Sequence, residues 1–332
     1  MNRIIPKARR SLQHLLLILS ACFLLACGST HESITSELNP YVTLDNDRLK
    51  VQISSLGAEL QSIVNKQSGR EVLWIGDSTY WEQKSPIMFP VNVRFKDDQF
   101  SYQSKVYQMP SMGLAMIQEF VQEPDNSPQK TTFSFQSSEQ SRTNYPFDFR
   151  LEVQYELQQQ TLINRFILKN TGTDSMYFAL GGHPGFYCPL DNGKTRADYE
   201  YVFPEPLSIS RIEVAGNFLQ DNIIPFLSNE SRLSLADERI PNGGMFMKAS
   251  NIQTIGIAET GKAPFVSLNL GDFPNINLWS PPGSPYACIE PMVSHHDIEL
   301  SPIEIEKKSH LIVLPPGGTN TYAYSIIVHD TP

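Results

Sequence analysis

Apolar and polar residues alternate with a period of two through much of the chain beyond residue 40. The alternation is clearest at 49–54, 151–157 and 322–328, where every second side chain is aliphatic or aromatic. Alternation over four or more residues gives a strand one apolar and one polar face, which is typical of antiparallel sheets. Shorter apolar runs predict further strands at 161–169, 176–181, 252–258, 265–270, 286–290 and 310–315.

Clusters of Gly, Pro, Asn and Ser separate these segments, as at 67–69, 170–172 and 281–283, and predict turns between strands. Helical periodicity is almost absent, and 208–219 is one of the few short segments whose pattern allows a helix. No repeat of roughly 20–50 residues is visible, which argues against a propeller or a solenoid. The pattern therefore predicts the all-β class, with one large domain of many strands over residues 41–332.

The first 40 residues differ from the rest of the chain. Basic residues among the first ten precede an apolar run at 15–26 that only Ser20 interrupts. This run is too short to cross the ~30 Å hydrocarbon core of a membrane. A basic head with a short apolar core is typical of an export signal, so we expect residues 1–26 to be a signal peptide.

The apolar run ends in Leu24-Leu25-Ala26-Cys27-Gly28, which resembles a bacterial lipobox. The resemblance implies that Cys27 becomes the lipid-modified first residue and anchors the protein to a membrane of the bacterial cell envelope, facing the periplasm or the exterior. Leu19-Ser20-Ala21-Cys22 also fits the pattern but leaves a shorter apolar stretch before its cysteine. Residues 28–40 are polar and predict a flexible tether. The alternative is a plain secretory signal with incidental cysteines.

Composition and charge narrow the function classes. The chain of 332 residues is 40% apolar and 18% charged, which excludes a disordered, collagen-like or coiled-coil protein. Its net charge of −9 makes nucleic acid an unfavourable partner, because phosphate contact depends on Lys and Arg. Beyond Cys27 only Cys188 and Cys288 remain. An exported protein can carry a disulfide between them but does not require one, and our hypothesis is two free, semi-buried thiols. Their spacing is not that of a metal site, and we expect neither metal nor cofactor.

One candidate for chemistry is the run Leu180-Gly181-Gly182-His183-Pro184-Gly185-Phe186, which follows a predicted strand. Glycine lets the backbone turn sharply or approach another group closely, and a residue before proline is held in extended geometry. His183 therefore lies on stiff, irregular backbone. A lone histidine is more often structural, but histidine is also the side chain that titrates near neutrality.

A second candidate is the predicted strand that ends in Glu290. Alternate residues of a strand share a face, so Tyr286, Cys288 and Glu290 point the same way. A carboxylate beside an aromatic ring and a thiol is partly desolvated, which raises its pKa. The alternative is a strand-end glutamate that reaches solvent. Together, His183 and Glu290 suit a general acid and base that move protons without a covalent intermediate.

Motifs in collinear order over residues 42–328 resemble those of the aldose 1-epimerase (galactose mutarotase) family. They are Leu56-Gly57-Ala58-Glu59-Leu60, Leu73-Trp74-Ile75-Gly76-Asp77 with Tyr80-Trp81, Phe89-Pro90-Val91 leading to Arg94, Tyr145-Pro146-Phe147-Asp148-Phe149, the His183 run with Cys188-Pro189-Leu190, Trp279 with Cys288-Ile289-Glu290-Pro291, and Leu314-Pro315-Pro316-Gly317.

The resemblance implies a large antiparallel β-supersandwich with an open sugar cleft, and an isomerase that interconverts the α and β anomers of an aldohexose. It implies that His183 protonates the ring oxygen, that Glu290 takes the proton of the anomeric hydroxyl, and that Arg94 binds sugar hydroxyls. Relatives of this kind are usually monomers or weak dimers.

Three aromatic side chains, Trp279, Tyr80 and Trp81, are candidates for contact with the sugar ring, although core packing is the expected role of at least two of them. His295-His296-Asp297 is sequential rather than spaced like a metal site, and the family has an ordinary loop there.

The chain departs from the family at three positions. Met112 stands where relatives have a second active-site histidine, Met116 where they have an arginine, and Gly243 near a sugar-binding aspartate. Each lost contact costs about 1–3 kcal/mol of binding. Two alternatives therefore stay open. One is a non-catalytic carbohydrate-binding lipoprotein with the same cleft, and the other is a hexose-phosphate mutarotase, which the methionine at 116 disfavours.

Overall fold

The period of two seen in the sequence corresponds to long antiparallel strands. In the computed structural model, β10 (Phe149–Gln158) and β11 (Thr161–Asn170) pair along their whole length. Alternate residues of β10 are buried, which puts Leu151, Val153 and Tyr155 in the core. The structure describes residues 41–330 except 216–217 and 242–243. The expected signal peptide, Cys27, the tether and Gly243 lie outside the described residues.

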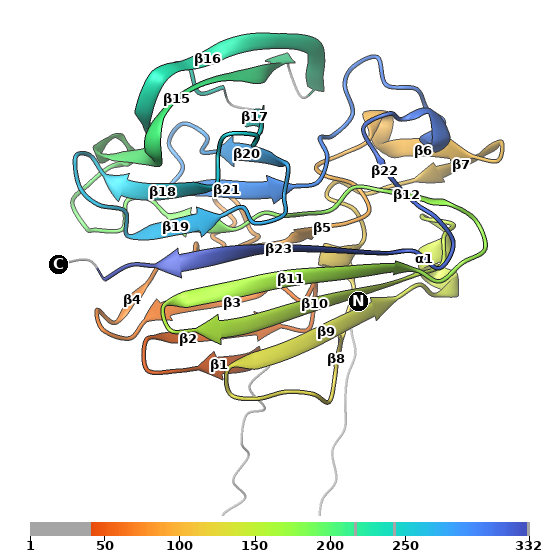
Figure 1. Ribbon diagram of the computed structural model, residues 1–332, viewed down its shortest axis with the longest axis horizontal. Coiled ribbons are helices and arrows are strands. Elements are labelled where there is room, and N and C mark those ends of the chain that lie inside the picture. Colours follow the sequence, from red (N-terminus) through yellow and green to blue (C-terminus); the bar gives the residue numbers. More distant parts are fainter. Residues whose placement is uncertain (1–40, 216–217, 242–243, 331–332) are drawn as a thin grey trace, which may run out of the picture. The chain divides into compact units, whose positions relative to one another are not determined.

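A nine-stranded antiparallel sheet runs through the molecule (Figure 1). The last strand, β23, lies at its middle and pairs with both β11 and β19. In spatial order the strands are β16 (Phe218–Ser234), β15 (Tyr199–Ala215), β18 (Thr254–Glu259), β19 (Val266–Asn269), β23 (Thr319–Val328), β11, β10, β9 (Lys130–Gln136) and β8 (Val121–Gln122).

Two smaller sheets pack against the nine-stranded sheet. The Tyr155 hydroxyl of β10 donates to the Ala58 carbonyl beside the four-stranded sheet at 2.7 Å, and the Tyr324 ring of β23 lies against Gly182 of the six-stranded sheet. The four strands are β1 (Tyr41–Asp45), β2 (Leu49–Ser54), β3 (Leu60–Asn65) and β4 (Arg70–Glu71). The six are β17 (Met245–Lys248), β20 (Asn275–Trp279), β21 (Tyr286–Met292), β13 (Gly181–Gly182), β5 (Ile87–Met88) and β14 (Gly185–Tyr187).

The other elements are short. Two two-stranded sheets lie outside the three larger ones: the hairpin of β6 (Gln99–Tyr102) and β7 (Lys105–Gln108), and the pair of β12 (Met176–Phe178) with the distant β22 (Ile312–Leu314). The helical elements are α1 (Glu139–Arg142) and the 3₁₀ turns η1 (Lys96–Asp98), η2 (Ala115–Ile117), η3 (Arg196–Asp198) and η4 (Ile305–Lys307). The predicted all-β, antiparallel fold is confirmed, because paired sheets enclose the core.

The helix allowed at 208–219 is wrong. The described residues of this segment belong to β15 and β16, which pair as Ile212↔Ile223 and Val214↔Leu219. Pairing with a neighbouring strand satisfies the backbone groups that a helix would satisfy internally, and such tertiary pairing overrides a weak local preference. The two strands extend beyond β18, and β15 packs against β17 of the six-stranded sheet (Figure 1).

Candidate active site

Strand β21 carries both core and site residues, because its two faces serve different surroundings. All seven residues are buried. Ala287 and Ile289 belong to the main hydrophobic core, whereas Tyr286 and Cys288 belong to a separate aromatic cluster. Glu290 faces a cavity. The predicted common face of residues 286, 288 and 290 is confirmed.

His183 lies in the link between β13 and β14, directly against β21. Gly181 before the link pairs with Met292, and Gly185 after it pairs with Cys288. The link therefore runs alongside β21, with His183 opposite Glu290. Close packing explains two of the glycines. A Cβ atom on Gly182 would lie 2.8 Å from the Tyr324 ring, and one on Gly185 would lie 2.8 Å from the Trp81 ring. The Gly-Gly-His-Pro-Gly run therefore lets the histidine approach the carboxylate.

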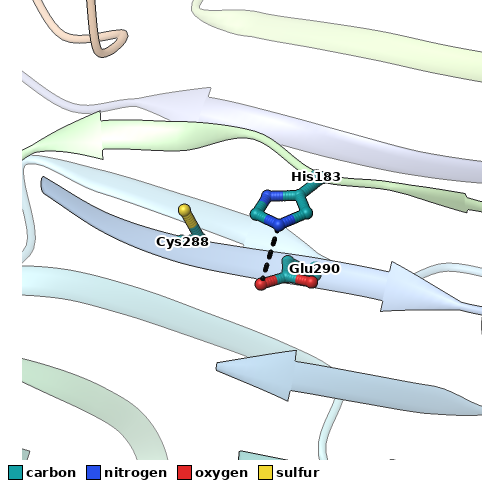
Figure 2. A group of neighbouring side chains, drawn as sticks. All are labelled: His183, Cys288 and Glu290. Carbon is teal, nitrogen blue, oxygen red and sulfur yellow. Dashed lines mark ion pairs between the residues drawn. The ribbon is translucent and has the colours of Figure 1, made fainter. Parts of the chain in front are cut away.

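The two titratable side chains face each other. The His183 Nε2 and Glu290 Oε1 atoms are 3.4 Å apart, and both side chains are buried (Figure 2). The Trp81 ring lies 4.7 Å from the His183 ring between centroids, and the Trp279 ring meets it edge-on at 5.5 Å. Among the described residues, neither His183 Nδ1 nor either Glu290 carboxylate oxygen forms a hydrogen bond. Buried polar atoms without partners are rare in folded proteins, and here three of them belong to two side chains in contact.

Burial shifts the two pKa values in opposite directions. Loss of hydration raises the pKa of Glu290 to about 8, with the Asn277 amide across the sheet acting in the opposite sense. Loss of hydration lowers the pKa of His183 to about 3. Each shift favours the uncharged form, as expected for a group removed from water. Burial therefore favours a protonated Glu290 and a neutral His183 in the protein alone.

The pair opens into a cavity of about 320 Å³, which is at the lower end of the ~300–1,000 Å³ typical of small-molecule pockets. Its walls are formed by loops around β5, by the end of β15, and by strands β20 and β21. The lining residues are Trp81, Val93, Arg94, Ser111, Met112, His183, Val214, Asn277, Trp279, Glu290 and His296.

A family model described as aldose 1-epimerase matches residues 40–205 of the chain. The chain belongs to the aldose 1-epimerase family. The matched segment includes Arg94 and His183 and ends before Glu290, so the inclusion of Glu290 in the site depends on its geometry.

Relatives of this aldose 1-epimerase family member cover nearly all of the described domain. The plasmid-encoded protein LacX of Lactococcus lactis is 28% identical over 303 residues, which are 86% of this chain and 99% of LacX. A galactose mutarotase related enzyme from Lactobacillus acidophilus has 27% identity and a TM-score of 0.83, over 88% of this chain and 98% of that one. A galactose mutarotase-like protein from Lactobacillus casei has 28% identity and a TM-score of 0.81, over 87% and 100%.

Five of the residues expected at the site of this family member line the one cavity: Arg94, Trp81, Trp279, His183 and Glu290. Tyr80 does not. Its side chain is 52% exposed, and its ring contacts the Trp74 ring edge-on at 6.3 Å. Trp81 lines the cavity and contacts the His183 ring, whereas Tyr80 lies outside the lining, so a contact of Tyr80 with the sugar stays a prediction.

The three departures from the family have different positions. Met112 lines the cavity, so the change from histidine to an apolar side chain at this position alters the site itself. Met116 is absent from the lining, and its backbone lies against Gly57 instead. Gly243 is not described, but Gly244 packs on Asn277, where a Cβ atom would lie 2.7 Å from the amide oxygen. Of the described departures, only Met112 alters the cavity surface.

Two polar residues that line the cavity, Asn277 and His296, were not predicted from the sequence. Asn277 is the cross-strand partner of Glu290, which the sequence does not disclose because strand pairing is not local. The segment at 295–297 is a loop, as expected, but it is buried rather than ordinary. Burial lowers the pKa of His296 to about 3, and the neighbouring His295 and Arg94 act in the same direction. His296 is therefore a neutral hydrogen-bonding group.

Asp297 fastens this loop to the one that carries Arg94. Its backbone N–H donates to the Arg94 carbonyl at 3.3 Å, and its carboxylate accepts the backbone N–H of Lys96 at 2.8 Å. The Lys308 ammonium donates to the same carboxylate oxygen at 2.5 Å. The ring of His310 lies beside this pair and stacks on His295 at 4.7 Å. Asp297 thus positions Arg94 and His296 next to each other.

The two thiols are free, as expected, but they are fully buried rather than semi-buried. Burial raises the pKa of both Cys188 and Cys288, which disfavours the reactive thiolate. Cys288 lies beside the pair, and its sulfur, a His183 nitrogen and a Glu290 oxygen lie within 4.8 Å of one another (Figure 2). These donor types can ligate zinc.

In the described part of the chain, no helix is long and apolar enough to cross a membrane.

Proposed function

We propose that this protein is a mutarotase that interconverts the α and β anomers of an aldose through acid–base opening and closing of the sugar ring. The observation that carries the proposal is the His183–Glu290 pair, held 3.4 Å apart at the wall of a cavity of sugar size. Membership of the aldose 1-epimerase family supports the reaction class.

The chemistry requires an acid and a base on either side of one carbon. His183 gives a proton to the ring oxygen while Glu290 takes the proton of the anomeric hydroxyl. The bond between C1 and the ring oxygen breaks, and an oxygen lone pair forms the C1 aldehyde. Rotation about the C1–C2 bond presents the other aldehyde face, and the reverse transfers close the ring. Each positioned transfer contributes about 10²–10⁴-fold.

The starting proton position must change for this scheme. Desolvation favours the protonated form of Glu290 in the protein alone, whereas ring opening needs a protonated His183. A sugar hydroxyl that donates to the carboxylate favours its ionised form and lowers its pKa. The short His183–Glu290 separation then allows the proton to pass to the imidazole as substrate binds.

Other lining residues suit sugar binding. The Arg94 guanidinium is a permanently charged fork that can donate to two hydroxyls at once. Trp279 and Trp81 can present aromatic surface to the ring. Arg94 is the only lysine or arginine among the described lining residues, which disfavours a hexose phosphate as substrate.

The proposal is tested by polarimetry of freshly dissolved α-glucose and α-galactose with the wild-type protein, His183→Ala and Glu290→Gln. We expect acceleration over buffer by wild type and loss of at least 10²-fold in each variant. A folded wild-type protein that binds sugar without acceleration would contradict catalysis. That outcome would favour the second candidate, a carbohydrate-binding protein, for which the apolar Met112 in the lining is the supporting observation.

We also propose that the protein is exported and anchored by a lipid on Cys27, on the strength of the signal-like residues 1–26. Several acyl chains give stable attachment, whereas a single chain holds a protein only marginally. Cys27→Ala should release the protein from the membrane fraction or block its maturation, and Cys22→Ala should not. Unchanged fractionation of Cys27→Ala would exclude Cys27 as the anchor.

A further inference from the structure

The cavity has two apolar walls of different chemistry. On one side, Trp81 and Trp279 belong to the aromatic cluster around Tyr286 and Cys288. On the other side, Val93, Met112 and Val214 pack on a separate aliphatic-rich cluster. We call these three side chains the aliphatic wall. The buried members of the cluster behind it are Met88, Leu219, Phe246 and Met292.

Strand β21 places the acid–base pair between the two walls. Along one face of the strand, Cys288 belongs to the aromatic cluster, Glu290 lines the cavity, and Met292 belongs to the cluster behind the aliphatic wall. Alternate residues of a strand lie about 7 Å apart. A sugar ring engaged by Glu290 therefore has aromatic surface towards one side and aliphatic surface towards the other.

Two hydrogen-bond donors next to the aliphatic wall already have an acceptor within the protein. The Met112 backbone N–H donates to the Val93 carbonyl at 2.5 Å, and the Ser111 hydroxyl donates to the same carbonyl at 3.1 Å. Val93 and Met112 have φ values of +58° and +62°, so both residues lie in the left-handed backbone region. The three side chains of the wall carry no hydrogen-bond donor, and the Met112 N–H and the Ser111 hydroxyl beside them already donate within the protein.

A hydroxyl pressed against such a wall loses its water without gaining a partner. The penalty for an unsatisfied buried hydroxyl is about 1–3 kcal/mol, whereas a methyl group in the same place gains about 0.8 kcal/mol per buried carbon. Apolar pockets discriminate against an added hydroxyl by up to about 10²-fold. An aldose that lacks one hydroxyl should therefore fit this cavity better than its parent hexose.

We propose that the substrate is a deoxy-aldose, a sugar that turns hydrogen or methyl towards Val93, Met112 and Val214 where a common hexose carries a hydroxyl. The proposal rests on the proposed mutarotase function, because it concerns the same cavity. It differs in what it requires: the proposed function needs the acid and base, and this proposal needs the aliphatic wall.

The test measures anomer interconversion of glucose beside 2-deoxy-, 3-deoxy- and 6-deoxyglucose, and of galactose beside 6-deoxygalactose, with each sugar's uncatalysed rate subtracted. We expect kcat/KM for at least one deoxy sugar to exceed that of its parent by 10-fold or more. Equal or faster turnover of both parents compared with every deoxy sugar would overturn the proposal and leave the mutarotase function standing.

Three variants connect the preference to the wall. Met112→Gln and Val214→Thr add a hydrogen-bonding group at the cavity surface and should shrink the deoxy-to-parent ratio several-fold. Met116→Gln makes the same chemical change four residues further along, outside the lining, and should leave the ratio unchanged. A ratio that Met112→Gln and Val214→Thr leave intact would overturn the proposal.

If no sugar is turned over, the mutarotase function fails, and calorimetric binding of the same sugar pairs still decides the substrate class. Tighter binding of a deoxy sugar by 10-fold or more supports the proposed preference of the aliphatic wall for a deoxy sugar. Tighter binding of both parents contradicts it.

Discussion

The Asp297 carboxylate and the Lys308 ammonium lie 2.5 Å apart, and both side chains are buried. The same carboxylate accepts a backbone N–H from Lys96, and the Lys308 nitrogen lies 4.9 Å from the centre of the Phe95 ring. This ion pair therefore sits behind Arg94 rather than in the cavity. It holds in place a loop whose side chains form the cavity.

Lys308→Met should destabilise the protein by about 3–5 kcal/mol, because it leaves a buried carboxylate without its counter-ion. Chemical denaturation measures the change. The adjacent Lys307 forms an exposed pair with Glu304, so Lys307→Met should cost at most about 1 kcal/mol. The double variant Asp297→Asn/Lys308→Met should recover part of the loss. Equal effects of Lys307→Met and Lys308→Met would refute the structural role of the buried pair.

The stability of the protein should fall between pH 6.5 and 8, owing to Glu290. Its folded-state pKa of about 8 lies above the ordinary 4.5, so its contribution is full below pH 4.5 and is lost as the pH rises through 8. His183 behaves oppositely: with a folded-state pKa of about 3 against an ordinary 6.5, its contribution is full above pH 6.5 and is lost as the pH falls towards 3.

Of Glu290 and His183, only Glu290 changes its contribution to the stability of the protein above pH 6.5. The free energy of unfolding should fall by about 1.4 kcal/mol per pH unit from this group. Glu290→Gln should remove that slope in urea titrations at pH 6.5, 7.25 and 8. Glu205→Gln, at an exposed position, should keep the wild-type slope. Parallel slopes for wild type and Glu290→Gln would show that the carboxyl is not desolvated as described.

Arg94→Lys should raise KM by roughly 10-fold with a smaller effect on kcat. Lysine keeps the positive charge but loses the planar fork that can donate to two hydroxyls. A lost hydrogen bond to a charged group costs about 1.5–3 kcal/mol. Polarimetry over a range of sugar concentrations separates KM from kcat. A fall in kcat alone would assign Arg94 to the proton-transfer step instead of binding.

Gly182→Ala should cost about 1–3 kcal/mol of stability and reduce activity further by displacing His183. The added methyl would lie 2.8 Å from the Tyr324 ring, and that ring is fixed because Asn164 donates to its hydroxyl at 2.9 Å. Thermal unfolding and polarimetry check the two effects. Gly182→Ala/Tyr324→Leu removes the clash and should regain activity. A fully active single variant would show that the histidine link tolerates movement.

The local sequence pattern predicted most strands because the side chains of a half-buried strand alternate between its two faces. In β10, buried and half-buried residues alternate from Phe149 to Leu157. The pattern failed at 208–219, where pairing with β16 decides the structure. Glu290 and His183 were found through strand periodicity and a Gly-rich motif. Asn277 and His296 were not, because one reaches the site by cross-strand pairing and the other by a buried loop tied to Asp297. Nothing in the local sequence distinguishes Tyr80, which lies outside the lining, from Trp81, which belongs to it.

Strand β21 sends Ala287 and Ile289 into the main core and Glu290 towards the cavity. A shift of one residue would exchange the two faces, so an insertion or deletion here would abolish both folding and chemistry. The loops at 93–94 and 111–112 and the end of β15 border the same cavity without holding the acid or the base. Substitutions in those segments change the surface that a ligand meets and leave His183 and Glu290 in place.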